Sequence, residues 1–381
     1  MNIEHSPELA EMRPAIRRFV TGQLDPISRQ IDETGELPPQ AMAELRAQGY
    51  LGMRLPEELG GGGFDMSTYC LVMEEVARSH RIYTVMLDAT SGLTPSAIAL
   101  HGTPEQKAKY VARLASGEGL ASFALTEPDA GSDAAAMRTS ATRVAGGWKI
   151  NGIKHYISAA HRAEVIMVMA VTDPQLRARG GITAFLVDRG AVGMEITRVD
   201  KTIASDPIQL AEIRFDDCFV PDAAVLGEVG QGFAIAMGSL ASGRMSVSAA
   251  CIGAADRLIE MAVAWARERV TFGQALSERQ AIQWMLADSA TELAHARALA
   301  YDVLRRLDAG EAVGSGPSMV KLFCSEMVGR VADRVVQIFG GAGLIRGLPI
   351  ERFYRDVRHY RIGEGSSEVQ RMLIARALFK G

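Results

Sequence analysis

The chain has 381 residues, of which 48% are hydrophobic and 23% are charged, and its formal net charge is −4. This length and composition predict two or three domains with a buried core, and the slightly acidic balance excludes a basic face for nucleic acid. The N-terminus starts with acidic residues, and the apolar runs are too short to span a bilayer, so neither a signal peptide nor a membrane anchor is expected. We therefore expect a cytoplasmic protein with no membrane partner.

The cysteines and histidines give no sign of a metal site. The 4 cysteines and 7 histidines are dispersed. No CxxC, HxxxH or HExxH spacing occurs. Zinc sites and disulfide frameworks have recognisable spacings, and these are absent here. We expect no metal and interpret the cysteines as core thiols.

Residues 1–121 are expected to form an N-terminal helical domain. Apolar residues recur at helical spacing in 7–20, and residues 38–49 begin with prolines and end with glycine, which is typical of a helix. Residues 67–79 and 104–117 continue this pattern. A bundle of helices is the simplest way to bury these apolar faces.

Residues 122–231 have a different texture, and we expect a central antiparallel β-barrel domain there. Short segments rich in β-branched residues are separated by glycine, proline or aspartate. The expected strands are 147–158, 164–172, 181–190, 194–200 and 209–221.

Long helical patterns return in 232–381, which we expect to be a C-terminal four-helix bundle. Examples are the stretch that ends at Arg267 and residues 278–308 and 318–340. The fold class is therefore α+β. Strands and helices do not alternate, so the pattern argues against a doubly wound nicotinamide-binding sheet.

Three short segments carry residues that suit a flat, phosphate-bearing ligand. Phe123–Asp133, "FALTEPDAGSD", has hydroxyls and a tight turn of small residues. Tyr156 and Ser158 lie two apart on an expected strand and share a face. Arg267–Gly273, "RERVTFG", places arginines where they could hold a diphosphate. An ordinary loop, ordinary sheet packing and a helix-dipole contact explain the same residues equally well.

Nine segments in order resemble the acyl-CoA dehydrogenase family, flavoenzymes that oxidise acyl-CoA thioesters to 2-enoyl-CoA. They cover nearly the whole chain: "LTEPDAGSD", "WKINGIKHYIS", "GITAFLV", "RFDDCFVP", "GFAIAM", "RERVTFG", "QAIQWMLAD", "QIFGGAG" and "IGEGSSEVQR". The resemblance implies the same α–β–α order, FAD as cofactor, a homotetramer built as a dimer of dimers, and a place in fatty acid metabolism. It also implies an electron-transfer flavoprotein as partner.

The family resemblance implies roles for individual residues. The segment from Phe123 to Ser132 would meet the flavin, and Arg269, Thr271, Gln280 and Gln337–Gly341 would come from a neighbouring subunit. The expected cofactor-binding residues are Phe123, Leu125, Thr126, Gly131, Ser132, Tyr156, Ile157, Ser158, Arg269, Thr271, Phe272, Gln280, Gln337, Ile338, Gly340, Gly341, Ser366 and Glu368. The expected substrate-binding residues are Ser132, Arg244 and Gly365.

Glu364 stands at the position of the family's catalytic base, between two glycines. A base that removes the weakly acidic α proton must lie within hydrogen-bond reach of Cα in a dry pocket, where burial raises its pKa. The β hydride would pass to flavin N5. The plainer alternative is that Glu364 only favours the positive end of the following helix.

Three positions depart from parts of the family. One branch carries its base just before the arginine that aligns with Arg244, and here that neighbour is Gly243. Gly363 replaces an aromatic residue of many straight-chain enzymes, which we interpret as room for a branched or bulky acyl group. Ala241 replaces an acid of some straight-chain members.

Two alternatives remain from the sequence. A same-fold acyl-CoA oxidase, which uses oxygen, keeps the same base, and a non-enzymatic helical scaffold would lack Arg269, Glu364 or the 126–128 loop. The acyl chain, the electron acceptor and the pathway are not predicted, although the helix around 90–98 is expected to form the pocket floor.

Overall fold

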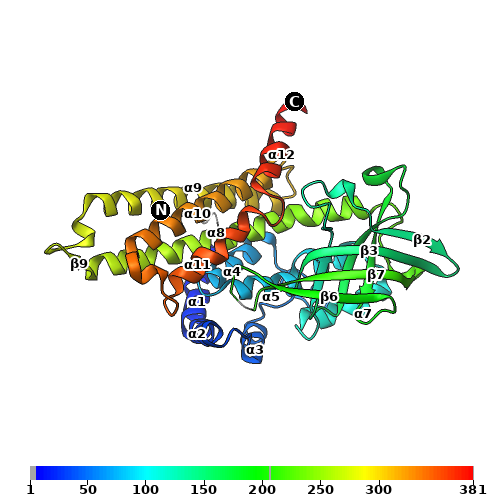
Figure 1. Ribbon diagram of the computed structural model, residues 1–381, viewed down its shortest axis with the longest axis horizontal. Helices are drawn as coiled ribbons and strands as arrows, with labels where there is room; N and C mark the ends of the chain where they lie inside the picture. The colour runs from blue at the N-terminus through cyan, green and yellow to red at the C-terminus, as the bar shows by residue number, and fades with distance from the viewer. Residues whose placement is uncertain (1–5, 206, 381) are drawn as a thin grey trace.

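The computed structural model describes residues 6–205 and 207–380, and the predicted order of helices, sheet and helices is confirmed (Figure 1). The N-terminal helices are α1 (Pro7–Phe19), α2 (Asp25–Thr34), α3 (Pro39–Ala47), α4 (Met66–Ala77), α5 (Arg81–Ser91), α6 (Leu93–His101) and α7 (Pro104–Ala115). Local signals set their ends: Asp65 caps α4 by accepting from the Thr68 N–H, and Thr103 and Gln106 form a capping box on α7.

The central sheet has eight strands in the order β6-β7-β3-β2-β4-β5-β8, with β1 added beside β4. Its strands are β1 (Ala121–Ala124), β2 (Ser140–Val144), β3 (Gly147–Ser158), β4 (Val165–Val171), β5 (Ile182–Asp188), β6 (Met194–Lys201), β7 (Gln209–Pro221) and β8 (Val225–Leu226). The antiparallel prediction needs a correction, because β1 and β2 both pair with β4 in parallel. Over the described residues β6 and β8 end the strand path without pairing with each other, so the sheet is not a closed barrel.

The C-terminal helices are α8 (Gly232–Glu268), α9 (Gln280–Asp308), α10 (Gly316–Phe339), α11 (Pro349–Val357) and α12 (Ser367–Lys380). A hairpin of β9 (Val270–Thr271) and β10 (Gln274–Ala275) joins α8 to α9. In Figure 1 helix α8 runs from the sheet on one side to this hairpin at the far side of the molecule, and α9 and α10 lie along the part of α8 nearer the hairpin.

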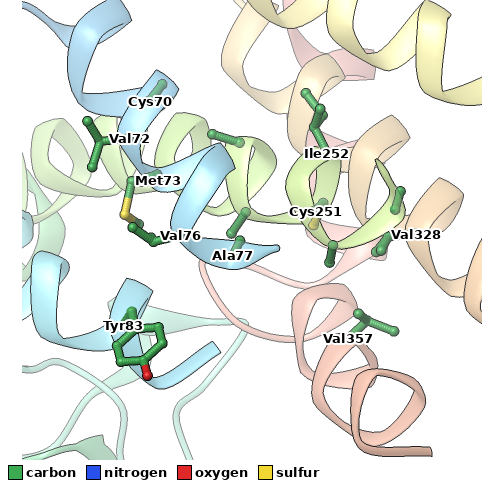
Figure 2. Close-up of a cluster of buried hydrophobic side chains, with 14 of the residues drawn as sticks. Cys70, Val72, Met73, Val76, Ala77, Tyr83, Cys251, Ile252, Val328 and Val357 are labelled. Atoms are coloured by element: carbon green, nitrogen blue, oxygen red, sulfur yellow. The ribbon is translucent and has the colours of Figure 1, made fainter. Parts of the chain in front are cut away.

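One hydrophobic core joins the N-terminal and C-terminal helices. All residues of α4 are buried, as expected for a helix that is apolar nearly all round. Figure 2 shows Cys70, Met73 and Val76 of α4 beside Cys251 of α8 and Val328 of α10. The sheet has hydrophobic clusters of its own, so the helices form one packed body from two separate stretches of sequence.

The expectations about membrane-spanning segments and about the cysteines can be compared with the described part of the chain. Over residues 6–205 and 207–380, no helix is long and apolar enough to cross a membrane. The four cysteines are free and buried, which agrees with their interpretation as core thiols.

Candidate active site

Glu364 lies in the turn between the 3₁₀ helix Arg358–Arg361 and α12, and its backbone is left-handed. Its φ is 57° and that of Gly365 is 90°. A glutamate with positive φ is uncommon and persists only where the surroundings hold it. The Gln370 amide Nε2 donates to the Glu364 and Gly365 carbonyls, each at 3.0 Å, and Lys321 Nζ donates to the Gly365 carbonyl at 2.6 Å. These two side chains, which we call the carbonyl clamp, fix the direction of the glutamate.

The Glu364 carboxyl is a strong proton acceptor in this setting. Its Oε2 is buried and has no hydrogen-bond partner within the described chain. Burial, with a further contribution from the Asp88 carboxylate, raises the pKa of Glu364 to about 8, although Arg244 and Lys321 oppose the shift. A partly buried acid with a raised pKa and a free oxygen matches what a general base needs.

Helix α8 passes directly behind this carboxyl. A Cβ on Gly243 would lie 2.7 Å from Glu364 Oε2 and 2.8 Å from Leu93 Cδ2, so only glycine allows this approach. The next residue, Arg244, has a buried Nε without a hydrogen-bond partner in the described chain, and burial lowers its pKa. Glu364 and Arg244 influence each other's pKa, so two buried polar atoms without partners in the described chain lie near each other where the sequence predicts the thioester.

The start of α6 links Glu364 to the predicted flavin face. A Cβ added at Gly243 would meet Leu93 as well as Glu364, so both side chains border the same space. The next residue, Thr94, donates to the Ser122 carbonyl of β1 at 3.0 Å. The Ser122 hydroxyl then donates to the Ser158 carbonyl at 2.8 Å. Two hydrogen bonds therefore join the start of α6, which borders the same space as Glu364, to the strand end that carries Tyr156 and Ser158.

Tyr156 and Ser158 are both exposed on β3, as predicted, although the strand is bulged between Lys154 and Ile157. Tyr156 has a φ of 59°, is 57% exposed, and stacks on the His155 ring at 3.8 Å between centroids. An open aromatic face beside an exposed hydroxyl can accept a flat ring. The predicted neighbours Leu125 and Ile157 are buried instead and support this surface from below.

A buried ion pair anchors the predicted flavin loop. Lys154 Nζ donates to the Leu125 carbonyl and to Glu127 Oε1, both at 2.9 Å. Burial lowers the pKa of Lys154 to about 8. Although burial alone would raise the pKa of Glu127, Lys154 and the N–H donors of Arg138 and Thr139 bring it below its usual value. The His155 N–H also donates to the Thr126 carbonyl at 2.9 Å, so the loop and strand are tied together.

The predicted cofactor residues of the β9–β10 hairpin and of the Gln337–Gly341 segment lie far from this face. Arg269 is the last residue before the β9–β10 hairpin, whose tip, Phe272, is 99% exposed. Phe339 stacks on Trp265 at 4.8 Å, which places the Gln337–Gly341 segment at the same end of the bundle. In Figure 1 the hairpin and β3 occupy opposite sides of the molecule. The chain therefore brings together only part of the predicted set.

The room inferred at Gly363 is not present. A Cβ there would lie 2.5 Å from His359 Nε2 and 2.7 Å from its Cε1. The glycine is needed because the imidazole packs against the backbone, so the interpretation as space for a bulky acyl group is wrong in its premise.

Several residues of the site were missed by reading the sequence. Gln370 stands within the "EGSSEVQR" segment, so its motif gave a signal, whereas Lys321 and Asp88 lie in helices whose patterns only predict burial. Among the described residues there is no group of three or more His, Cys, Asp or Glu that could hold a metal.

Comparisons with known proteins cover the whole molecule. Three family models match: the acyl-CoA dehydrogenase N-terminal domain at residues 6–118, its middle domain at 122–218 and its C-terminal domain at 230–379. An acyl-CoA dehydrogenase of Bacillus subtilis is 35% identical over 374 residues, 98% of each chain. A 3-(aryl)acrylate reductase of Clostridium sporogenes is 36% identical over 97% of this chain and 98% of its own.

Solved structures agree with these matches. The glutaryl-coenzyme A dehydrogenase structure with glutaryl-CoA aligns with a TM-score of 0.95 and 32% identity, over 100% of this chain and 97% of the other. A structure of PigA with FAD and proline aligns with a TM-score of 0.94 and 27% identity over all of both chains. Similar proteins therefore include a flavin complex.

Proposed function

Because this chain belongs to the acyl-CoA dehydrogenase family, whose members are oxidoreductases acting on CH–CH bonds, we propose that it oxidises an acyl-CoA thioester to the 2-enoyl-CoA. The observation that carries the proposal is the buried, unpartnered Oε2 of Glu364, held on a left-handed turn by the carbonyl clamp.

In this proposal Glu364 removes the α proton of the thioester. FAD, when bound, accepts the β hydride. The Glu364 N–H, Gly365 and Arg244 would lie at the thioester, and Gly243 keeps the face behind the carboxylate clear. Thr126, Tyr156 and Ser158 would position the ring, because they share one connected surface with the start of α6.

Assembly and partners follow from the same proposal. Arg269, Thr271, Phe272, Gln280 and Gln337–Gly341 would hold the FAD of a neighbouring subunit. Most of them are exposed at the other end of the bundle, whereas Ile338 and Phe339 are buried. We propose a homotetramer, a dimer of dimers, that passes electrons to an electron-transfer flavoprotein.

The experiment is Glu364→Gln in the FAD-loaded enzyme, followed by anaerobic bleaching of the flavin with acyl-CoA thioesters. An amide cannot take the proton, so we expect FAD to stay bound and turnover to fall by about 10² or more. Glu58→Gln, at an exposed glutamate, is the control. Activity of the Gln variant within a few-fold of the parent contradicts the assignment.

The Clostridium sporogenes relative favours a second candidate, the same chemistry in reverse on a carbon–carbon double bond. Enoyl-CoA would then reoxidise the reduced enzyme faster than an electron-transfer flavoprotein or oxygen does. Oxygen as the fastest oxidant would instead indicate an acyl-CoA oxidase.

A further inference from the structure

Beside Glu364, on the side of α4 and α5, lies a polar cluster made of Arg54, Tyr69, Asp88 and Ser242. Arg54 Nη1 donates to the Ser242 hydroxyl of α8 at 2.6 Å, and its guanidinium carbon lies 5.9 Å from the centre of the Tyr69 ring on α4. Asp88 of α5 completes the cluster, since its charge acts on both Tyr69 and Glu364.

Arg54 has unused donors. No carboxylate of residues 6–205 or 207–380 lies within ion-pair distance of it, and its single side-chain hydrogen bond there goes to a neutral hydroxyl. A guanidinium offers five donors in a planar fork that matches a carboxylate or another pair of oxygen acceptors. Arg13, by contrast, pairs with Glu74 at 2.8 Å.

Tyr69 supplies an independent sign of a missing partner. Its side chain is 1% exposed, and its hydroxyl has no hydrogen-bond partner in the described chain. Leaving a buried hydroxyl unsatisfied costs about 1–3 kcal/mol, so a native structure normally provides a partner. The orphaned hydroxyl and the unused guanidinium both donate, and therefore both suit an oxygen acceptor.

The cluster is next to the reacting end of the proposed site. Ser242 precedes Gly243, and an added Cβ on Gly243 would meet both the Glu364 carboxyl and Leu93. Asp88 packs against Gly92, where a Cβ would clash with its carboxylate, and Gly92 precedes Leu93. The two glycines thus bring the polar groups close to the carboxyl that takes the proton.

We propose that the polar cluster binds an oxygen-bearing group of the acyl chain, at a position beyond the two carbons that are oxidised. A carboxylate should bind most strongly. This inference rests on the proposed function and names its substrate class. Arg54 and the Tyr69 hydroxyl donate to that oxygen, and the charge of Asp88 acts on both of these groups. A plain hydrocarbon tail would leave all of these donors unpaired and desolvated.

The test uses three thioesters of matching shape at several chain lengths, with glutaryl-CoA, 5-oxohexanoyl-CoA and 5-methylhexanoyl-CoA as the reference set. Their ends carry two, one and no oxygen atoms. Binding is measured by calorimetry to the FAD-loaded Glu364→Gln variant, and kcat/KM on the parent enzyme. We expect oxygen-bearing chains to be preferred over the hydrocarbon by about ten- to a hundredfold.

Variants then assign the preference to the cluster. Arg54→Met should bring the binding ratio of glutaryl-CoA to 5-methylhexanoyl-CoA close to one, and Tyr69→Phe should lower it several-fold. Arg18→Met, at an exposed arginine of α1, is the matched control and should leave the ratio unchanged. FAD content and thermal unfolding of each variant show that it is folded, and the Tyr69→Phe arm stands if Arg54→Met does not fold.

Two results overturn the inference. One is equal binding of all three thioesters by the Glu364→Gln variant with equal kcat/KM on the parent enzyme, and the other is a preference that survives both Arg54→Met and Tyr69→Phe. Either leaves the proposed function intact as long as some acyl-CoA bleaches the flavin. Failure of every thioester to bind or to bleach would overturn both.

Discussion

The two ends of the long helix α8 differ in how many supporting residues surround the predicted site residues. At the sheet end the chain supplies a base, a clamp for its backbone and a connected surface for a ring, and most of the supporting atoms are buried. At the hairpin end Arg269, Thr271 and Phe272 extend outward with little around them, and Phe272 is almost fully exposed. This contrast supports the proposal that the hairpin serves a neighbouring copy of the chain.

The sharpest way to break this comparison is a mixing experiment. Glu364→Gln and Arg269→Ala should each be inactive, the first without its base and the second without its hold on FAD. If the hairpin serves a neighbouring subunit, refolding the two variants together creates some sites with both a native Glu364 and a native Arg269. In a mixed dimer up to about half of the sites have both. Activity should therefore reappear on mixing, as measured by flavin bleaching.

The control for the mixing experiment is each variant refolded alone at the same total concentration. Absence of recovery, although mixed oligomers form by mass spectrometry, would show that base and hairpin serve the same chain's site.

The pH dependence sharpens the description of the sheet end. Because burial raises the pKa of Glu364 to about 8, the free enzyme holds the base protonated at neutral pH. kcat/KM should therefore rise about tenfold per pH unit up to pH 8 and level off above it, close to a hundredfold over two units. A flat profile between pH 6 and 8 contradicts the raised pKa.

The pH dependence of stability is a second test of the raised pKa of Glu364. A carboxyl whose pKa is raised on folding stabilises the fold at low pH, and this contribution is lost as pH rises from its unfolded value of about 4.5 through about 8. The melting temperature of Glu364→Gln relative to the parent should increase across that range and then stay constant. An identical pH trend in both proteins would exclude the shift.

Removing one donor of the carbonyl clamp should have the next largest effect. Lys321→Met keeps most of the volume but removes the donor to the Gly365 carbonyl and a positive charge near Glu364. We expect kcat to fall about tenfold, since a hydrogen bond from a charged group contributes about 1.5–3 kcal/mol. The pKa seen in kcat/KM should also move upward, because Lys321 lowers the pKa of Glu364.

Lys107→Met, at a partly exposed lysine of α7, is the matched control for this change. A loss of stability without any move of the pH profile would mean that Lys321 is only a packing residue.

The smallest effect is expected at Gly363. Gly363→Ala places a methyl group 2.5 Å from His359 Nε2, so the fold should lose about 1–3 kcal/mol and all acyl-CoA substrates should suffer alike. Adding His359→Ala should restore part of the melting temperature. A selective loss on branched substrates would instead revive the interpretation of Gly363 as acyl space.

The sequence by itself determined the order of helices and strands and marked Glu364. Periodicity of apolar residues and the positions of glycine and proline are local properties, and they set α7, β4 and α10 closely. The nine ordered segments resembled a known family before any coordinate was available. Residues within a motif, such as Glu364 and Arg269, could be named because their neighbours in sequence identify them.

Only the tertiary structure decided what surrounds those residues. The parallel pairing of β1 with β4, the carbonyl clamp from Lys321, and the charge of Asp88 all join positions far apart in the chain. Gly363 shows the same limit, since its reason is the imidazole ring that packs on it. A residue's pKa, its unused hydrogen bonds and the space beside it depend on long-range packing, which no local pattern specifies.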